Sequence, residues 1–360
     1  MAPQSPVRNL RGRRPHTRSS LKRRVGVAAI AMAMWLLPSA HAAVGFQSIT
    51  ASGLSMGLWY PTQSTETPGR IGPFDVTLAF DAPPHPGRSL QPILMSHGNS
   101  GRMRNHNLTA KALAEAGFLV IAPTHSIDHL VGGEDTYKAM NWRTVELAHA
   151  LEAVLQIAEF RNIVDVSRVH AVGYSLGALT ALNAAGAGID GTLIEAHCSR
   201  DVDPAFCDTP SWFLRQKLRY LRGAKPPPLP RDIASLHYPL PFVNGGVAVV
   251  APVGQGATFH GNLFQASKLF IVGFESDDVT VAKYHAQYLA ETFPPDRIAH
   301  FSLRAGHHAA FIAPFAKRVT DDQFIEAAQD PDGFDRGQFL DKLNRELVAF
   351  FTDQSQPKEP

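Results

Sequence analysis

The stretch that decides the fold is Val169-His170-Ala171-Val172-Gly173-Tyr174-Ser175-Leu176-Gly177. Its apolar first part, within Arg168–Gly173, predicts a buried strand, and Ser175–Ala187 predicts an Ala-rich helix. A G-x-S-x-G sequence between a strand and a helix is the setting of a nucleophile elbow, in which the serine occupies a tight, strained turn. Side chains at the two glycine positions would collide with the neighbouring strand and helix. Ser175 is therefore predicted to be a nucleophile; the alternative is an ordinary helix N-cap serine.

The segments around this stretch predict an α/β fold with a mostly parallel central sheet. From residue 91 onward, short apolar runs alternate with longer segments of helical period, which is typical of βαβ units. The predicted strands are Pro92–Ser96, Phe118–Pro123, Arg168–Gly173, Val247–Pro252, Lys268–Phe274 and Ile298–Leu303. The predicted helices are Asn107–Ala116, Trp142–Phe160, Ser175–Ala187, His285–Thr292 and Gly337–Phe351. Residues 45–60 and 74–80 alternate in polarity and predict an antiparallel opening.

A serine hydroxyl needs a base to remove its proton and an acid to orient that base. After a nucleophile elbow these partners follow in the order Ser, Asp/Glu, His. The strand predicted over Lys268–Phe274 runs into Glu275-Ser276-Asp277-Asp278. Asp277 is predicted to be the acid, with Asp278 and then Glu275 as alternatives.

The last predicted strand supplies the base. Ile298–Leu303 runs into Arg304-Ala305-Gly306-His307-His308, so both histidines follow a strand end. His307, directly after Gly306, is predicted to be the base, and His308 is its rival.

A tetrahedral intermediate needs hydrogen-bond donors aimed at its oxyanion. One donor is predicted to be the backbone N–H of Leu176, the residue after the nucleophile. The second is predicted to be the backbone N–H of Asn99, in the loop Ser96-His97-Gly98-Asn99-Ser100-Gly101 that follows the strand Pro92–Ser96. His97 is expected to support this loop and not to act as a base.

These motifs together resemble the predicted dienelactone-hydrolase group of α/β-hydrolases, which is also similar to the plasma-type platelet-activating-factor acetylhydrolases. The matching pieces span roughly residues 53–315 and are Leu58-Trp59-Tyr60-Pro61, Met95-Ser96-His97-Gly98 with Gly101, Ala122-Pro123-Thr124-His125, Gly173-Tyr174-Ser175-Leu176-Gly177, Val249-Val250-Ala251-Pro252 and Ala305-Gly306-His307 with Phe311. The resemblance implies the α/β-hydrolase fold and a Ser-Asp-His esterase without metal or organic cofactor. Its implied substrates are short acyl esters or related lactones.

The chain also departs from that group. True dienelactone hydrolases resemble it in fold but use a cysteine where Ser175 stands, which argues against a diene lactone as substrate. The acidic loop lacks the proline often found just after it, so Asp277 and Asp278 stay open as the acid. Three other functions are considered: a polyester or cutin-type hydrolase, an acyltransferase with the same triad, and a non-catalytic binding protein on a hydrolase scaffold.

The charge distribution points to an exported protein that does not bind nucleic acid. Residues 1–43 contain eight basic residues and no acid, and the remainder has 26 basic against 32 acidic residues, a net charge of −6. An acidic body offers no electrostatic footprint for nucleic acid. The basic stretch leads into the apolar run Val25–Leu37 and an A-x-A site at Ala40–Ala42, which predicts a cleavable signal peptide. Arg23-Arg24 leaves the twin-arginine route open, and a retained anchor is the alternative reading, although the run is short for a membrane span.

The remaining chain is predicted to be one hydrolase domain over residues 44–352, followed by a disordered tail over 353–360. Residues 188–240 break the βα rhythm and are predicted to form a lid-like insertion over the carboxyl edge of the sheet. Cys198 and Cys207 lie in this insertion, nine residues apart, which in an exported protein favours a local disulfide over two free thiols.

No metal site is predicted. His125, Asp128 and His129 could bind a metal if they were helical, but Pro123 and Gly132-Gly133 favour a loop, and three ligands are not evident. The sequence contains no G-x-G-x-x-G, Walker or H-E-x-x-H motif, which argues against nucleotide and zinc-peptidase chemistry.

Overall fold

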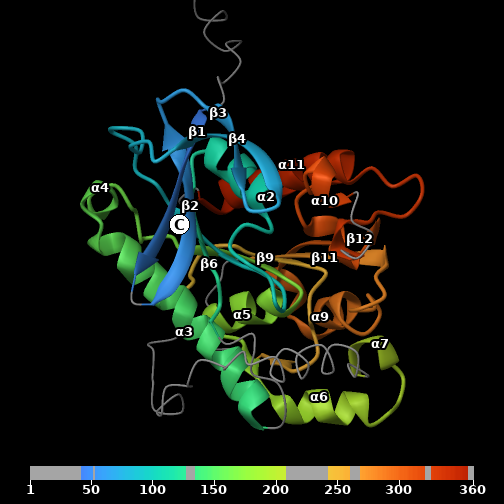
Figure 1. Cartoon of the computed structure of the whole chain (residues 1–360). Coiled ribbons are helices and arrows are strands. Elements are labelled where there is room, and N and C mark those ends of the chain that lie inside the picture. The colour runs from blue at the N-terminus through green and yellow to red at the C-terminus, as the bar shows by residue number, and fades with distance from the viewer. Residues whose placement is uncertain are drawn as a thin grey trace, which may run out of the picture. The chain divides into compact units, whose positions relative to one another are not determined.

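A ten-stranded sheet forms the centre of the fold (Figure 1). The computed structural model describes residues 42–51, 53–126, 134–207, 242–259, 268–320 and 326–355. Its strands are β1 (Ala43–Ala51), β2 (Leu54–Thr62), β3 (Thr67–Ile71), β4 (Phe74–Phe80), β5 (Pro92–Ser96), β6 (Leu119–Pro123), β7 (His170–Tyr174), β9 (Val247–Val250), β11 (Leu269–Ser276) and β12 (Ile298–His307). They lie in the order β12-β11-β9-β7-β5-β6-β2-β1-β4-β3.

The half of the sheet that contains β5 to β12 is parallel throughout. Its inner strands β5, β6, β7 and β9 are buried along their whole length. Strands covered on both faces read as continuous apolar runs, which is why they can be predicted from the sequence. The predicted antiparallel opening is present in part. β1 pairs antiparallel with β2, β2 with β6 and β3 with β4, but β4 lies parallel to β1, which the sequence did not predict.

Helices cover both faces of the sheet (Figure 1). They are α2 (Asn107–Glu115), α3 (Glu134–Gln156), α4 (Ala158–Arg161), α5 (Leu176–Ala184), α9 (Ala286–Thr292) and α11 (Arg336–Ser355), with the shorter α6 (Gly191–Cys198), α7 (Pro204–Cys207) and α10 (Lys317–Thr320). Residues of α3, α5 and α9 pack into one hydrophobic core, and residues of α2 and α11 pack into a second core on the opposite face. Side chains of successive strand residues point to opposite faces, so Leu94 belongs to the first core and Ile93 and Met95 to the second.

The predicted α/β-hydrolase fold is thus confirmed, with differences at element ends. The helix predicted over Trp142–Phe160 is in fact α3 and the separate short helix α4. The prediction of a disordered tail from residue 353 is wrong for its first three residues, because α11 continues to Ser355. Gln354 of these three residues is buried, as is Phe351 just before them, so packing extends the helix. The predicted signal peptide lies outside the described residues, apart from Ala42 and Ala43.

Three short 3-10 helices and a small two-stranded sheet complete the described elements. The 3-10 helices are η1 (Pro295–Arg297), η2 (His308–Phe311) and η3 (Glu326–Ala328). The small sheet pairs β8 (Gly188–Ile189) with β10 (Ala257–Thr258). Of the predicted insertion 188–240, the structure describes residues 188–207, and the rest lies outside the described residues. The lid therefore stays a prediction.

The described part of the insertion is fastened to the core. Cys198 and Cys207 form a disulfide with an Sγ–Sγ distance of 2.00 Å. Inside the loop that it closes, Oδ2 of Asp203 accepts hydrogen bonds from Nε2 of His197 and Nε2 of His285, each at 3.0 Å. The other ring nitrogen of each histidine faces an N–H donor, so both Nε2 atoms carry the proton. Because His285 lies directly before α9, this carboxylate ties the disulfide loop to the body of the protein.

Two other buried histidines make the stability of the fold dependent on pH. Burial lowers the pKa of His106 to about 4 and that of His170 to about 4, against an ordinary value of 6.5. Between pH 6.5 and 4 the unfolded chain therefore binds protons at these positions that the folded chain does not. Stability from this source is complete above pH 6.5 and falls as the pH is lowered toward 4.

We expect the free energy of unfolding to fall by about 1.4 kcal/mol per pH unit for each of these histidines within that window. Urea unfolding at pH 7.5, 6.0 and 5.0 would measure the slope. In the double variant H106Q/H170Q, the slope of the unfolding free energy against pH should decrease by the contribution of up to two protons, about 2.7 kcal/mol per pH unit. An unchanged slope in that variant would show that other groups cause the acid destabilisation.

Candidate active site

Ser175 stands on a strained turn between β7 and α5. Its backbone has φ 53° and ψ −120°, a region that costs a residue with a side chain about 1–3 kcal/mol. Hydrogen bonds hold the turn on both sides: the Ser175 N–H donates to the Val250 carbonyl at 3.1 Å, and the Ser175 carbonyl accepts from the Val253 N–H at 3.0 Å. The serine is thus presented at the carboxyl end of β7, where the sequence placed the nucleophile elbow.

The two glycines of the elbow are required by close backbone contacts. A Cβ on Gly173 would lie 2.1 Å from the Gly177 carbonyl oxygen. A Cβ on Gly177 would lie 2.1 Å from the Ser96 carbonyl oxygen. Both atoms that would be struck belong to the backbone, so neither could move aside. The G-x-S-x-G pattern therefore follows from the packing of β7, α5 and β5.

His308 is the histidine that reaches Ser175. Its Nε2 lies 3.1 Å from the Ser175 Oγ, and its Nδ1 lies 3.0 and 2.9 Å from the two carboxylate oxygens of Asp277. Three side chains from three strand ends thus form one hydrogen-bonded chain of nucleophile, imidazole and carboxylate. This is the arrangement that lets an imidazole accept a proton from a serine hydroxyl.

The prediction of His307 as the base is wrong. Nε2 of His307 lies 2.9 Å from Oδ1 of Asp330, which is also held by Arg336 at 2.6 Å. The reason is the length of β12, which continues to His307 instead of ending at Leu303. The first residue beyond the strand is therefore His308, the rival in the sequence analysis, and it turns toward Ser175.

Asp277 is the acidic residue of its loop that meets the imidazole. Its side chain is fully buried, whereas Asp278 and Glu275 are exposed. Besides His308, it accepts hydrogen bonds from the N–H groups of Val279 at 2.9 Å and Thr280 at 2.7 Å. These donors fix the orientation of the carboxylate toward His308.

Tyr174 is a part of the site that was not predicted from the sequence. Its hydroxyl donates a hydrogen bond of 2.6 Å to the His308 carbonyl, and its ring lies 5.2 Å from the imidazole. Burial raises the pKa of Tyr174 well above 10, and the negative charge of Asp277 acts in the same direction. The hydroxyl therefore stays protonated and holds the backbone of His308, the residue that carries the imidazole. The only signal in the sequence was its place inside the elbow motif.

The loop after β5 lies against the nucleophile. A Cβ on Gly98 would be 3.2 Å from the Ser175 Cβ and 2.9 Å from the Tyr174 ring. Asn99 follows on this loop and is exposed. Leu176 is the first residue of α5, and the first N–H groups of a helix have no acceptor within it. The two residues predicted to donate to an oxyanion therefore belong to segments that adjoin Ser175.

A second buried chain of serine, histidine and carboxylate lies beside this loop. Ser96 Oγ lies 2.9 Å from Nε2 of His125, and Nδ1 of His125 lies 2.8 Å from Oε2 of Glu146. All three residues are buried, and Ser96 has no exposed surface. Substrate cannot reach it, so it is not a second nucleophile.

The described residues contain no group of three or more histidine, cysteine, aspartate or glutamate side chains placed to hold a metal ion. Of the three residues considered for a metal in the sequence, Asp128 and His129 lie outside the described residues.

Among the helices of the described residues, none is both long and apolar enough to cross a membrane.

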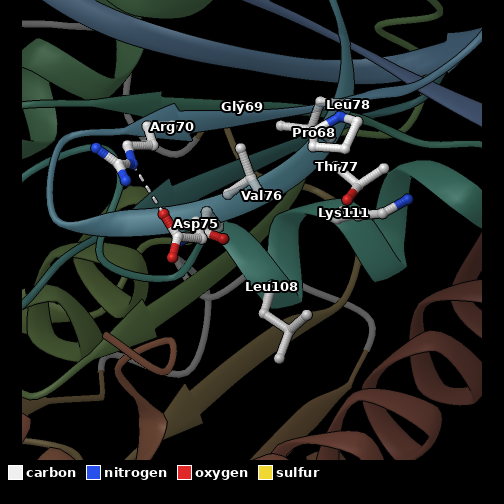
Figure 2. A pocket seen from close by; sticks show the side chains of 10 residues that line it. Pro68, Gly69, Arg70, Asp75, Val76, Thr77, Leu78, Leu108 and Lys111 are labelled. Atoms are coloured by element: carbon white, nitrogen blue, oxygen red, sulfur yellow. Dashed lines mark hydrogen bonds and ion pairs between the residues drawn. The ribbon is translucent and has the colours of Figure 1, made fainter. Parts of the chain in front are cut away.

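A surface hollow that none of the triad residues lines lies between the β3–β4 hairpin and α2 (Figure 2). Figure 2 shows Leu108 and Lys111 of α2 on one side and Asp75 and Val76 of β4 on the other. Lys111 is already paired with two glutamates. The hollow contains none of the triad residues, so it is not part of the candidate active site.

The strand order, the strained elbow and the three converging side chains are those of an α/β-hydrolase. The family model described as Dienelactone hydrolase family matches residues 79–200, roughly one third of the chain. The matched segment contains β5, the loop after it and the elbow with Ser175. The resemblance to the dienelactone-hydrolase group is thus confirmed, and it supports a hydrolase in general terms. None of the curated protein sequences compared with the chain matches it.

Proposed function

We propose that this protein is a serine esterase that cleaves short-chain carboxylic esters through an acyl-enzyme on Ser175. The observation that carries the proposal is the hydrogen-bonded chain from the Ser175 Oγ through His308 to the buried carboxylate of Asp277. A serine hydroxyl is a poor nucleophile alone, and this chain supplies both the base and the group that orients it. The match to a hydrolase family supports the same chemistry.

In the first half of the reaction, the Ser175 Oγ attacks the ester carbonyl carbon while Nε2 of His308 takes the hydroxyl proton. Asp277 stabilises the imidazolium that forms. We assign the oxyanion donors to the backbone N–H groups of Leu176 and Asn99. His308 then protonates the leaving alcohol, the bond between the carbonyl carbon and the alcohol oxygen breaks, and the acyl group stays on Ser175.

In the second half, His308 removes a proton from water, and the resulting hydroxide attacks the acyl carbon. The tetrahedral intermediate collapses to the free acid, and the proton returns from His308 to the Ser175 Oγ. No metal or organic cofactor takes part in this scheme. An acyltransferase would follow the same first half and use an alcohol in place of water.

We also propose that the mature protein is exported. The disulfide between Cys198 and Cys207 supports this, because such bonds persist in oxidising compartments. The basic and apolar N-terminal sequence supports it independently. The substrate is then a small ester that the protein meets outside the cytoplasm.

The proposal is tested by combining an activity probe with an ester panel. A fluorophosphonate should label the chain once, and peptide mapping should place the adduct on Ser175. p-Nitrophenyl esters from acetate to longer chains, together with a short-chain phospholipid, should show turnover that is fastest at short acyl length.

Three results would redirect the proposal. Absence of both labelling and turnover would favour a binding protein on a hydrolase scaffold. Alcohol acceptors that compete with water for the acyl group would favour an acyltransferase. Turnover of a polyester film in preference to soluble short esters would favour a polyester or cutin-type hydrolase.

A further inference from the structure

The carbonyl of Gly98 is held by two hydrogen-bond donors. Nδ1 of His97 lies 2.7 Å from the Gly98 oxygen, and the N–H of Gly101 donates to the same oxygen at 3.1 Å. This carbonyl belongs to the planar peptide group whose N–H is that of Asn99. Because the C=O and N–H of a trans peptide point in opposite directions, fixing the oxygen also fixes the direction of the Asn99 N–H.

His97 can hold this carbonyl only in one tautomer. Its Nε2 accepts a hydrogen bond of 3.1 Å from the backbone N–H of His125, so the proton is on Nδ1, where it can donate to Gly98. Burial lowers the pKa of His97 well below its ordinary value, and the nearby positive charge of Arg143 acts in the same direction. The ring therefore stays neutral and keeps this tautomer.

Two charged side chains of α3 lie directly behind His97 and His125. Nη2 of Arg143 donates a short hydrogen bond to the His97 carbonyl and also faces the Ser96 Oγ at 3.4 Å. Oε2 of Glu146 accepts from Nδ1 of His125 at 2.8 Å. The hydroxyl of Ser96 faces the remaining nitrogen of His125, at 2.9 Å. The network thus reaches from α3 to the end of β5 and the loop that follows it.

The burial of this network is unusual for a purely structural device. Arg143 is 1% exposed and Glu146 is 3% exposed. Taking such charges out of water costs several kcal/mol each before their hydrogen bonds offset it, and well-packed apolar side chains often serve stability equally well. Polar groups of this kind are expected where a backbone must be held in one orientation. The backbone held here carries the predicted oxyanion donor.

We propose that Arg143 and Glu146 are positioning residues that, through His97 and His125, hold the Gly98–Asn99 peptide so that its N–H points at the oxyanion. The proposal rests on the proposed esterase function and adds to it the origin of the second donor. It also gives the buried chain of Ser96, His125 and Glu146 a role. That chain orients a loop and performs no nucleophilic chemistry.

Two sets of variants test the proposal with p-nitrophenyl acetate. In R143M/E146Q both charges are removed together, so that neither is left buried alone. In His97→Leu the donor to Gly98 is lost, whereas in His97→Asn the side-chain amide can place an N–H near the position of Nδ1. We expect kcat to fall roughly 10- to 100-fold in R143M/E146Q and in His97→Leu, with KM changed less than about threefold. Deleting an oxyanion donor costs about 10²- to 10³-fold in kcat, and a donor that is present but points away should cost somewhat less. His97→Asn should restore kcat to within about threefold.

A second measurement separates positioning from loss of stability. A boronic acid forms a tetrahedral adduct with the serine, so its affinity should weaken in parallel with kcat/KM. The matched control is Thr109→Val, which removes the buried hydrogen bond of 2.8 Å from Thr109 of α2 to Asn344 of α11, neither of which hydrogen-bonds to a triad residue or to the loop after β5. It should lower the melting temperature and leave kcat and boronate affinity unchanged.

The outcomes are distinguishable from failure of the proposed function. Unchanged kcat and boronate affinity in R143M/E146Q and His97→Leu, in preparations where Ser175→Ala is inactive, would overturn the positioning role and leave the esterase intact. The positioning role would also be overturned, with the esterase function intact, if His97→Asn lost as much kcat as His97→Leu. A wild-type protein without ester turnover or boronate binding would overturn the proposed function itself.

Discussion

Replacing His308 with Ala is expected to lower kcat for p-nitrophenyl acetate by about 10⁶-fold, the size of the loss when a triad histidine is deleted in a serine protease. The Ser175 Oγ has its base at 3.1 Å in His308 Nε2, and the neighbouring His307 is turned toward Asp330. Without His308, neither proton transfer to the leaving alcohol nor activation of water has a side chain to perform it. The measurement is the initial rate, with the melting temperature recorded to show that the variant is folded.

The adjacent histidine provides the matched control. His307→Ala removes the same side chain one residue earlier and breaks contacts with Asp330 and the Phe334 ring, neither of which belongs to the triad. We expect kcat to stay within about threefold of wild type. A large loss in His307→Ala together with an active His308→Ala would contradict the geometry and restore the prediction made from the sequence.

This pair of histidines shows where prediction from the sequence reaches its limit. The strand that delivers the base could be predicted from the apolar residues between Ile298 and Leu303, but its end could not. Arg304, Ala305 and Gly306 fit a loop as well as an edge strand, and β12 includes all three because it pairs with β11. A change of strand length by a few residues decides which of two adjacent side chains faces the nucleophile.

The nucleophile and the acid depend on shorter-range information. The elbow could be predicted because backbone contacts exclude side chains at Gly173 and Gly177, so both positions must be glycine and the motif is visible within five consecutive residues. The acidic loop after β11 could also be located, although not its acting residue. Burial selects Asp277 over Asp278, and burial depends on the N–H groups of Val279 and Thr280 that turn back onto the carboxylate.

The network behind the loop after β5 could not be predicted, because its members are far apart in the chain. Ser96 and His125 are 29 residues apart, and His125 and Glu146 are 21 residues apart. One signal was present: Arg143 and Glu146 lie three residues apart in a helix whose neighbours Val145 and Leu147 are apolar. Charged residues on the buried side of an amphipathic helix indicate partners inside the protein. The sequence does not say which partners.

Asp277→Asn is expected to lower kcat by about 10⁴-fold, the effect of the same change in a serine protease triad. The backbone N–H groups of Val279 and Thr280 both point at Oδ1, so the amide oxygen of the new side chain should occupy that position. Its NH₂ group then takes the place of Oδ2 and faces Nδ1 of His308, which was 2.9 Å from Oδ2. An N–H donor there stabilises the imidazole tautomer with the proton on Nε2, and a protonated Nε2 cannot accept the proton of Ser175.

Asp278→Asn makes the same chemical change one residue later, on an exposed side chain. It should leave kcat within about threefold, which separates the triad carboxylate from the general negative charge of the loop. The folded state of both variants can be compared by thermal unfolding, and the fluorophosphonate labelling rate should fall in Asp277→Asn alone. Equal losses in the two variants would mean that the loop acts through its charge. A fully active Asp277→Asn would mean that His308 needs no buried carboxylate, and the acyl-transfer scheme would have to be rebuilt around an imidazole that works without one.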